Sequence, residues 1–136
     1  MRIADHRRSE KVTRRQHTNA EKALAGLTAF FSIADEWGLE NEQQRVLLGS
    51  PGRTTFFDWK KKKKGHLSKD TLDRLSYLLG IYKALHILFS ARSALQWLRN
   101  PNKDPLFNGQ SPLDYMLSGY LVALADVRRY LDWARG

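Results

Sequence analysis

Residues 48–64 form a turn followed by a strongly basic segment. Of all segments in the sequence, this one has the residue types best suited to binding a ligand. Gly49 can adopt the left-handed backbone conformation that ends a helix. Ser50 can cap the next helix, and Pro51 suits the first turn of that helix. The order of these three residues therefore predicts two helices joined by a tight turn.

The second of these helices brings polar and basic side chains to one exposed end. The first turn of a helix leaves backbone N–H groups that can meet phosphates, and side chains there can reach base edges. We expect Arg53, Thr54 and Thr55 to contact DNA in this way. Phe56 and Trp59, three residues apart, share a face and should anchor the helix. The pattern is that of a DNA-binding helix-turn-helix.

A run of lysines extends the positive charge along this helix. Residues 53–64 hold six basic residues and one acid. Such a run is often only a solvated surface, but its position directly after a turn and a helix start favours DNA contact. Phosphate neutralisation would supply affinity without sequence information. The predicted phosphate contacts are Lys60, Lys61, Lys62, Lys63 and Lys64.

The remaining titratable residues form no pattern typical of catalysis or metal binding. Asp35 and Glu36 are adjacent, so their carboxylates project from different parts of a helix. Cysteine is absent, which excludes disulfides, zinc–thiolate sites and cysteine nucleophiles, and there is no glycine-rich phosphate loop. The histidines are scattered without metal-ligand spacing: His6, His17, His66 and His86. We predict a protein that is not an enzyme and has no catalytic residue, metal or cofactor.

Length and charge describe a small basic protein. The chain of 136 residues fits one compact domain, or two small ones that share a core. Its net charge of +9 is concentrated in residues 53–64 and in residues 1–19, which hold six basic and two acidic residues. A polyanion could meet both segments. We expect residues 1–19 to form a flexible tail, because they contain too few apolar side chains to offset the entropy of ordering them.

The sequence contains no pattern typical of a membrane protein. No apolar run approaches the roughly 20 residues that cross a bilayer. Residues 1–19 lack the apolar centre of a secretory signal. The absence of cysteine is compatible with a reducing cytosol. We therefore expect a cytoplasmic protein without a membrane partner.

Apolar spacing predicts an all-α fold that begins with an amphipathic helix over residues 20–37. Apolar side chains recur there every three or four residues, which places them on one face of a helix. The residues that mark this face are Leu24, Leu27, Phe31, Ala34 and Trp37. Asn41, with Gln44 three residues later, predicts the capped start of a short second helix.

Several further helices are expected after the lysine run. Ser68 can cap a long apolar helix that extends to about Phe89. Gly80 within it costs about 1 kcal/mol relative to alanine, which a kink or close helix packing would justify. Shorter helices are expected over residues 91–98 and from Ser111, and a last one from about Leu121 to the C-terminus. No alternating strand pattern appears.

Four sequence blocks resemble the Xre/MbcA/ParS antitoxins, and the resemblance extends over about residues 20–136. The blocks are residues 75–85, 97–102, 107–119 and 127–131. The resemblance implies an Xre-like helix-turn-helix unit followed by a small helical toxin-binding unit. It also implies a cognate toxin with the RES fold, encoded beside the antitoxin, that depletes cellular NAD. The chain would neutralise this toxin and repress its own operon.

Given this resemblance, the chain divides into four regions. They are a basic tail (1–19), a helix-turn-helix DNA-binding region (20–67), a helical dimerisation or connecting region (68–101) and a C-terminal toxin-binding region (102–136). Charged side chains near the C-terminus are candidates for pairing with the toxin, since arginine forms planar bidentate pairs. They are Arg128, Arg129, Asp132 and Arg135. The same side chains could equally be solvated surface.

Two expectations concern assembly. We expect a homodimer formed through the apolar segment 72–89, with paired recognition helices binding an inverted repeat whose half-sites lie about one helical turn apart. The alternative is a free-standing repressor whose C-terminal helices serve only for dimerisation. A RES-type toxin encoded next to this chain would favour the antitoxin, and its absence would favour the repressor.

Overall fold

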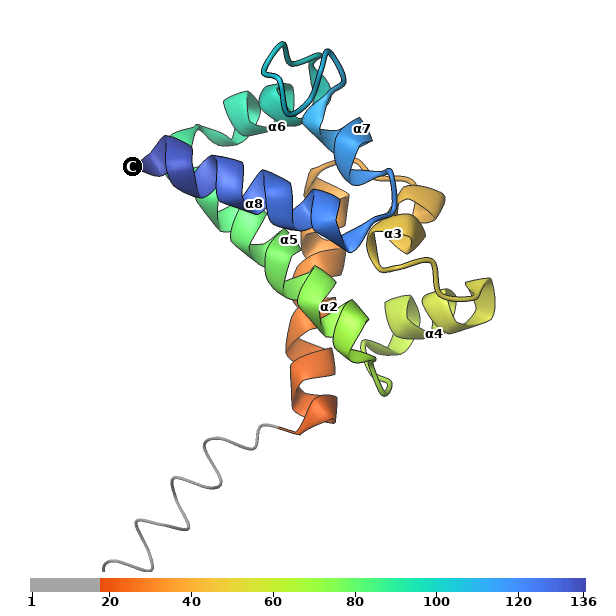
Figure 1. Ribbon diagram of the computed structural model, residues 1–136. Helices are drawn as coiled ribbons and strands as arrows, with labels where there is room; N and C mark the ends of the chain where they lie inside the picture. Colours follow the sequence, from red (N-terminus) through yellow and green to blue (C-terminus); the bar gives the residue numbers. More distant parts are fainter. Residues whose placement is uncertain (1–17) are drawn as a thin grey trace, which may run out of the picture.

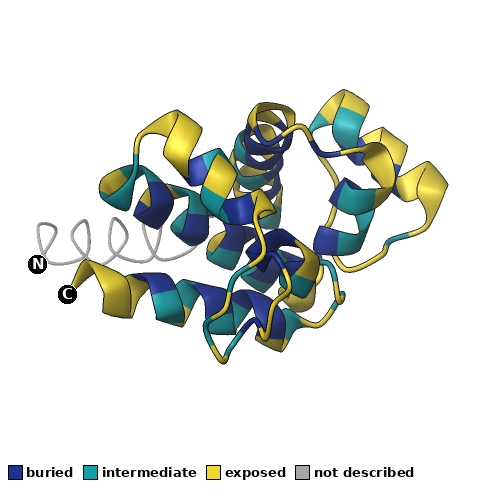
Figure 2. Cartoon of the chain, turned by 90° about the horizontal axis from the view of Figure 1, so that it is seen from above, coloured by how far each residue is buried: buried dark blue, intermediate teal, exposed yellow. Residues whose placement is uncertain are grey.

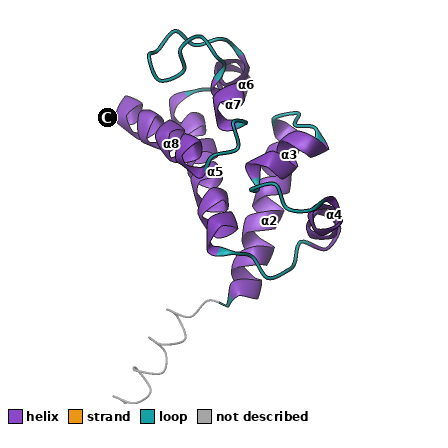
Figure 3. Ribbon diagram, turned by 45° about the vertical axis from the view of Figure 1, so that its right-hand side comes forward, coloured by secondary structure: helices purple, strands orange, loops and turns teal. Residues whose placement is uncertain are grey.

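The computed structural model describes residues 18–136, which fold into seven helices and contain no strand (Figure 1, Figure 3). The first three are α2 (Asn19–Glu36), α3 (Asn41–Leu47) and α4 (Arg53–Lys62). They are followed by α5 (Lys69–Leu88), α6 (Ala91–Arg99), α7 (Pro112–Met116) and α8 (Leu121–Arg135). The predicted all-α fold is confirmed. Residues 1–17, which make up most of the predicted tail, lie outside the described residues.

The long helix α5 forms the centre of the molecule. It packs against α8 and α2, and α8 lies along it in Figure 1. Residues coloured as buried gather where these helices meet, whereas exposed ones follow the outer edges (Figure 2). The apolar stripe of α5 is buried within its own chain at Leu75, Leu78, Ile81 and Leu85. The apolar surface of residues 72–89 led us to expect a dimer there. Most of that surface is buried within a single chain.

The first helix has nearly the face that its spacing predicts. Leu27, Phe31 and Trp37 are buried, as expected. Leu24 is 55% exposed, so its assignment to the buried face was wrong. Ala23 takes the inward position instead, because it lies four residues before Leu27 and therefore on the same side of the helix.

The start of α3 lies one residue earlier than predicted. Glu40 is the N-cap residue, and Gln43 completes the capping box by accepting a hydrogen bond from the Glu40 backbone N–H at 2.9 Å. Gln44, predicted to complete the box, is buried and donates to the carbonyl of Leu39 at 2.8 Å. Asn41, predicted as the cap, accepts a hydrogen bond from Lys60 at 2.6 Å. The one-residue shift leaves Gln44 free for this local contact and Asn41 free for its contact with α4.

The turn between α3 and α4 is a Schellman motif. Gly49 has a φ of +97°, which confirms the left-handed conformation predicted for it. The N–H of Ser50 donates to the carbonyl of Arg45 at 2.9 Å, and that of Gly49 donates to Val46 at 3.0 Å. Ser50 therefore completes the end of α3 and does not cap α4. Gly52 is the N-cap of α4, which places Pro51 outside that helix.

Close contact between α5 and α8 explains the glycine in the middle of α5. A Cβ added to Gly80 would lie 2.7 Å from Cζ of Arg128, well inside van der Waals contact. Only glycine leaves room for the arginine side chain to cross α5 at this point. The prediction of close helix packing at Gly80 is thereby confirmed.

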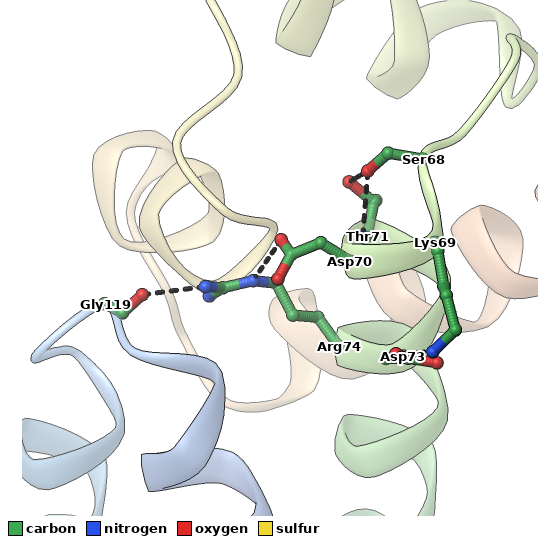
Figure 4. Close-up of polar contacts among 7 residues, drawn as sticks. All are labelled: Ser68, Lys69, Asp70, Thr71, Asp73, Arg74 and Gly119. Carbon is green, nitrogen blue, oxygen red and sulfur yellow. Dashed lines mark hydrogen bonds and ion pairs between the residues drawn. The ribbon is translucent and has the colours of Figure 1, made fainter.

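Two arginines join the N-terminal and C-terminal parts of the fold. Arg74 of α5 donates to Asp70 at 2.8 Å and to the carbonyl of Gly119, in the connection between α7 and α8, at 2.9 Å (Figure 4). Its side chain is only 8% exposed. Arg99 of α6 donates to the carbonyl of Trp37 at 2.5 Å, at the C-terminal end of α2. These contacts hold the helix-turn-helix against the C-terminal helices.

Candidate functional site

The start of α4 presents the three residues that were predicted to read DNA. Arg53, Thr54 and Thr55 form its first turn, and all three are exposed. The N-cap residue is Gly52, which has no side chain that could accept hydrogen bonds from the first-turn N–H groups. This end of α4 can therefore offer both backbone donors and polar side chains to a ligand.

Apolar anchors and a clamped turn hold α4 in place. Phe56 is buried, and its ring centroid lies 5.9 Å from that of Phe31 on α2. Trp59 is also buried, so both predicted anchors are confirmed. Arg45 donates to the carbonyl of Pro51 at 2.8 Å and pairs with Glu42 at 2.6 Å, which lowers the pKa of the Glu42 carboxyl. This clamp was not predicted: the i,i+3 spacing of Glu42 and Arg45 was the available signal for their pair, whereas no local pattern indicates the contact with the Pro51 carbonyl.

The lysine run divides into two groups. Lys61, Lys62 and Lys64 are exposed. Lys60 is half-buried and donates to Asn41, whereas Lys63 is half-buried and donates to the carbonyl of Lys60. The ammonium groups of these two half-buried lysines lie 6.0 and 5.4 Å from the ring centroid of Phe31. Of the five predicted phosphate contacts, three therefore face solvent and two contact the protein.

The first residue of α2 is fastened next to the end of the lysine run. The Asn19 side chain donates to the carbonyl of Leu67 at 2.9 Å and accepts from the Leu67 N–H at 2.9 Å. Thr18 caps the helix by accepting from the N–H of Glu21. The first described residues therefore lie beside the connection that follows the lysines.

The four charged residues predicted to bind toxin lie on two different sides of α8. Arg128 and Asp132 are paired at 3.0 Å, and Arg135 lies 3.7 Å from the same carboxylate. The Arg128 side chain crosses Gly80, and its Nη1 atom is buried without a hydrogen-bond partner. Arg129 points elsewhere, is 78% exposed and lies 3.6 Å from Asp126. The structure thus brings three of the four together and separates Arg129 from them.

A group of aromatic side chains, which we call the aromatic cluster, links every element of the C-terminal region. Its members are Phe89, Trp97, Phe107, Tyr115, Tyr130 and Trp133. Phe107 is buried, and its ring lies 5.8 Å from Trp97 and 5.5 Å from Tyr130. Burial raises the pKa of the Tyr130 phenol. A hydrogen bond to Asp126 raises the pKa of Tyr115.

The outer end of the aromatic cluster was not predicted. Trp133 is 76% exposed, and its ring centroid lies 6.1 Å from that of Tyr130. Together with Leu106, Asp126 and Arg129, these two side chains line a shallow hollow of about 370 Å³. The spacing of three between Tyr130 and Trp133 was the available signal, since it places both rings on one side of a helix.

The sequence predicts neither a metal site nor a membrane partner. Within residues 18–136, no three His, Cys, Asp or Glu side chains gather closely enough to hold a metal ion. None of the helices in that range combines the length and apolar character needed to cross a membrane.

Comparison with known proteins gives two matches from one family, and together they include both candidate surfaces. Residues 16–80 match the antitoxin Xre-like helix-turn-helix domain, and residues 84–136 match the antitoxin Xre/MbcA/ParS C-terminal toxin-binding domain. The chain belongs to the Xre/MbcA/ParS antitoxins. An uncharacterized protein of Sinorhizobium fredii (strain NBRC 101917 / NGR234), y4oB, is 50% identical over 120 residues, which cover 88% of this chain and 91% of that protein.

The two matched domains of this Xre/MbcA/ParS antitoxin meet inside α5, between residues 80 and 84. The exposed start of α4 and the lysine run lie in the helix-turn-helix match. The whole aromatic cluster and all four charged residues predicted on α8 lie in the match to the toxin-binding domain. The family therefore has a toxin as partner, and the candidate surface for that partner lies within residues 84–136.

Proposed function

We propose that this chain is the antitoxin of a type II toxin–antitoxin system that neutralises a RES-type, NAD-depleting toxin in the cytoplasm and represses its own operon. The observation that carries the proposal is the match of residues 84–136 to a toxin-binding domain directly after a helix-turn-helix. The same match favours an antitoxin over a free-standing repressor. The RES fold of the toxin follows from the resemblance of the sequence blocks to this family.

Repression would use the exposed start of α4. Arg53, Thr54 and Thr55 are positioned to reach base edges, because the buried face of α4 is fixed on α2. The exposed lysines Lys61, Lys62 and Lys64 would contact phosphates. The half-buried Lys60 and Lys63 would contribute mainly through the field of their charges, since each already donates to a protein oxygen.

Neutralisation would use α8 and the side chains around it. The helix has one exposed side with Arg129 and another with Arg128, Asp132 and Arg135. Capture of the toxin by such a surface needs no catalytic group in the antitoxin, because covering the substrate cleft of the toxin would be enough. The chain would then neutralise the toxin stoichiometrically, by forming a complex, and not as an enzyme.

A homodimer would place two recognition helices on an inverted repeat. The inner face of α5 is covered by α2 and α8, so a dimer must use another part of segment 72–89. Leu72 and Leu79 are half-buried and line a groove of about 550 Å³ between α2 and α5, with Ala25, Gly26 and Ser76. Small residues allow close helix approach, so this groove is the surface that we propose for dimerisation.

The direct test is co-expression of this chain with the product of the neighbouring gene, followed by affinity purification and mass measurement of any complex. Cellular NAD and growth are measured with and without this chain. We expect a stable complex, and NAD and growth that are restored when the chain is present. A neighbour whose product neither binds the chain nor lowers NAD would contradict the proposed toxin. Binding of the free chain to DNA from its own promoter region tests repression separately.

A further inference from the structure

Trp133 is the most exposed large apolar side chain in residues 18–136. A tryptophan can bury roughly 150–250 Å² on docking, more than most other side chains. A single exposed apolar side chain needs no special explanation. The surroundings of Trp133 therefore decide whether it is a binding feature.

The aromatic cluster gives Trp133 a rigid base. Tyr130 contacts Trp133 on its outer side and the buried Phe107 on its inner side, with ring centroids 6.1 and 5.5 Å apart. Trp97 stacks on Tyr130 at 6.1 Å with an interplanar angle of 21°. A side chain that is already positioned loses less conformational entropy when a partner covers it. Trp133 is thus both exposed and supported.

A largely exposed cation stands beside this platform. Arg129 lies four residues before Trp133, so both project from the same side of α8. Its contact with Asp126 is long, at 3.6 Å, and the Arg129 side chain remains 78% exposed. Trp133, Tyr130 and Arg129 line one hollow together with Leu106 and Asp126. Tryptophan, tyrosine and arginine are the residues most enriched among those that dominate binding energy at protein interfaces.

The other charged side of α8 has a different character. Arg128 pairs with Asp132 and lies against Gly80, and Arg135 is close to the same carboxylate. Asp132 therefore pairs with arginines of its own helix, and Arg128 supports the contact between α5 and α8. Arg129 differs from them because its charge remains largely available to a partner.

We propose that the surface formed by Leu106, Arg129, Tyr130 and Trp133, here called the Trp133 patch, is where the toxin docks. Trp133 enters an apolar pocket of the toxin, and Arg129 pairs with an acidic side chain at its rim. The occupant is the toxin because the whole patch lies within the match to the toxin-binding domain. This inference rests on the proposed function and selects one of the two exposed sides of α8.

The test measures the affinity of the full chain for the purified product of the neighbouring gene by titration calorimetry. Trp133→Ala should weaken binding at least about 30-fold, the effect of a dominant interface residue. Arg129→Glu should weaken it at least about tenfold, because it turns an attraction into a repulsion. The melting temperature should not change in either variant, since both side chains are exposed.

One matched variant serves as a control, and a second variant tests whether the toxin docks on the opposite side of α8. Val122→Ala removes another exposed apolar side chain of α8, 62% exposed, outside the patch. Arg135→Glu reverses a charge on the other side of the helix. Both should bind the toxin nearly as tightly as the unsubstituted chain. A second readout uses 5-fluorotryptophan, because the ¹⁹F solvent-isotope shift of Trp133 should disappear when the product is added.

The outcomes separate this inference from the function on which it rests. If the unsubstituted chain does not bind the product, the proposed function and the Trp133 patch are both wrong. If the unsubstituted chain binds and Trp133→Ala binds equally well, only the patch is wrong. Weakening by Arg135→Glu together with normal binding by Trp133→Ala would place the toxin on the opposite side of α8.

Discussion

The surfaces proposed to bind DNA and toxin in this antitoxin are built in different ways. The surface on α4 is made by neighbours in sequence, namely a Schellman turn, an exposed first helical turn and a lysine run. The surface on α8 is made by side chains from distant segments, since Phe107, Trp97 and Tyr130 support Trp133. Local backbone chemistry thus positions the charges of the first surface, whereas tertiary packing positions the aromatic platform of the second.

The largest expected effect tests whether the two halves fold as one unit. Phe107→Ala in the aromatic cluster and Phe56→Ala on α4 each remove a ring that is 1% exposed. Each should lower the free energy of unfolding by about 3–5 kcal/mol. Because one continuous core includes both rings, denaturant unfolding of either variant should remain a single transition by circular dichroism. Two separate transitions would show that the halves are independent domains.

The next largest effect is expected at Arg74, which links the N-terminal and C-terminal halves of the fold. Arg74→Met removes the hydrogen bond to the Gly119 carbonyl and should lower the free energy of unfolding by about 2–3 kcal/mol, because the donor is charged and buried. Lys69→Gln is the matched control, since it breaks an exposed pair with Asp73 on the same helix (Figure 4). Denaturant titration should show no change for the control. Equal effects of the two substitutions would contradict a linking role for Arg74.

The third prediction tests which lysines of the run contact DNA phosphates. Replacing Lys61, Lys62 and Lys64 together by glutamine should flatten the salt dependence of DNA binding by about 0.9 in log–log slope for each phosphate that is no longer neutralised. The decrease in affinity should be the same on promoter and random DNA. The paired control, Lys60→Gln with Lys63→Gln, should change the slope less per residue. Fluorescence anisotropy over a range of salt concentrations measures both, and an unchanged slope in the triple variant would exclude phosphate contacts.

The smallest effect concerns the packing behind α8. Gly80→Ala should destabilise the protein, because the added methyl group displaces Arg128 from the contact between α5 and α8. In an Arg128→Ala background, the same substitution should stabilise α5 by up to about 1 kcal/mol through helix propensity. A double-mutant cycle of thermal unfolding measures this coupling. Additive effects would mean that Gly80 is not needed for Arg128.

The sequence predicted those features that depend on neighbouring residues. The left-handed Gly49, the caps at Ser68 and Ser111 and the anchors Phe56 and Trp59 follow from local conformational preference and helical spacing. The predicted start of a helix was displaced by one residue where several neighbouring polar residues could act as the N-cap. Glu40 caps α3 in place of Asn41, and the Asn41 side chain contacts Lys60, a residue 19 positions away.

Features that depend on distant contacts could not be predicted. The division of the lysine run follows from Asn41 and Phe31, which spacing within the run does not reveal. The separation of Arg129 from Arg128 follows from how α8 lies on Gly80. The spacing of Tyr130 and Trp133 places both rings on one side of a helix, but only the folded aromatic cluster shows that Trp133 is both supported and exposed.

The most direct measurement is a titration of two full-length variants against two partners, DNA from the chain's own promoter region and the purified product of the neighbouring gene. The triple lysine variant should lose affinity for DNA and bind the toxin normally. Trp133→Ala should lose affinity for the toxin and bind DNA normally. If either variant loses both partners while its melting temperature is unchanged, or if both variants lose the same partner, the chain does not carry two separate binding surfaces.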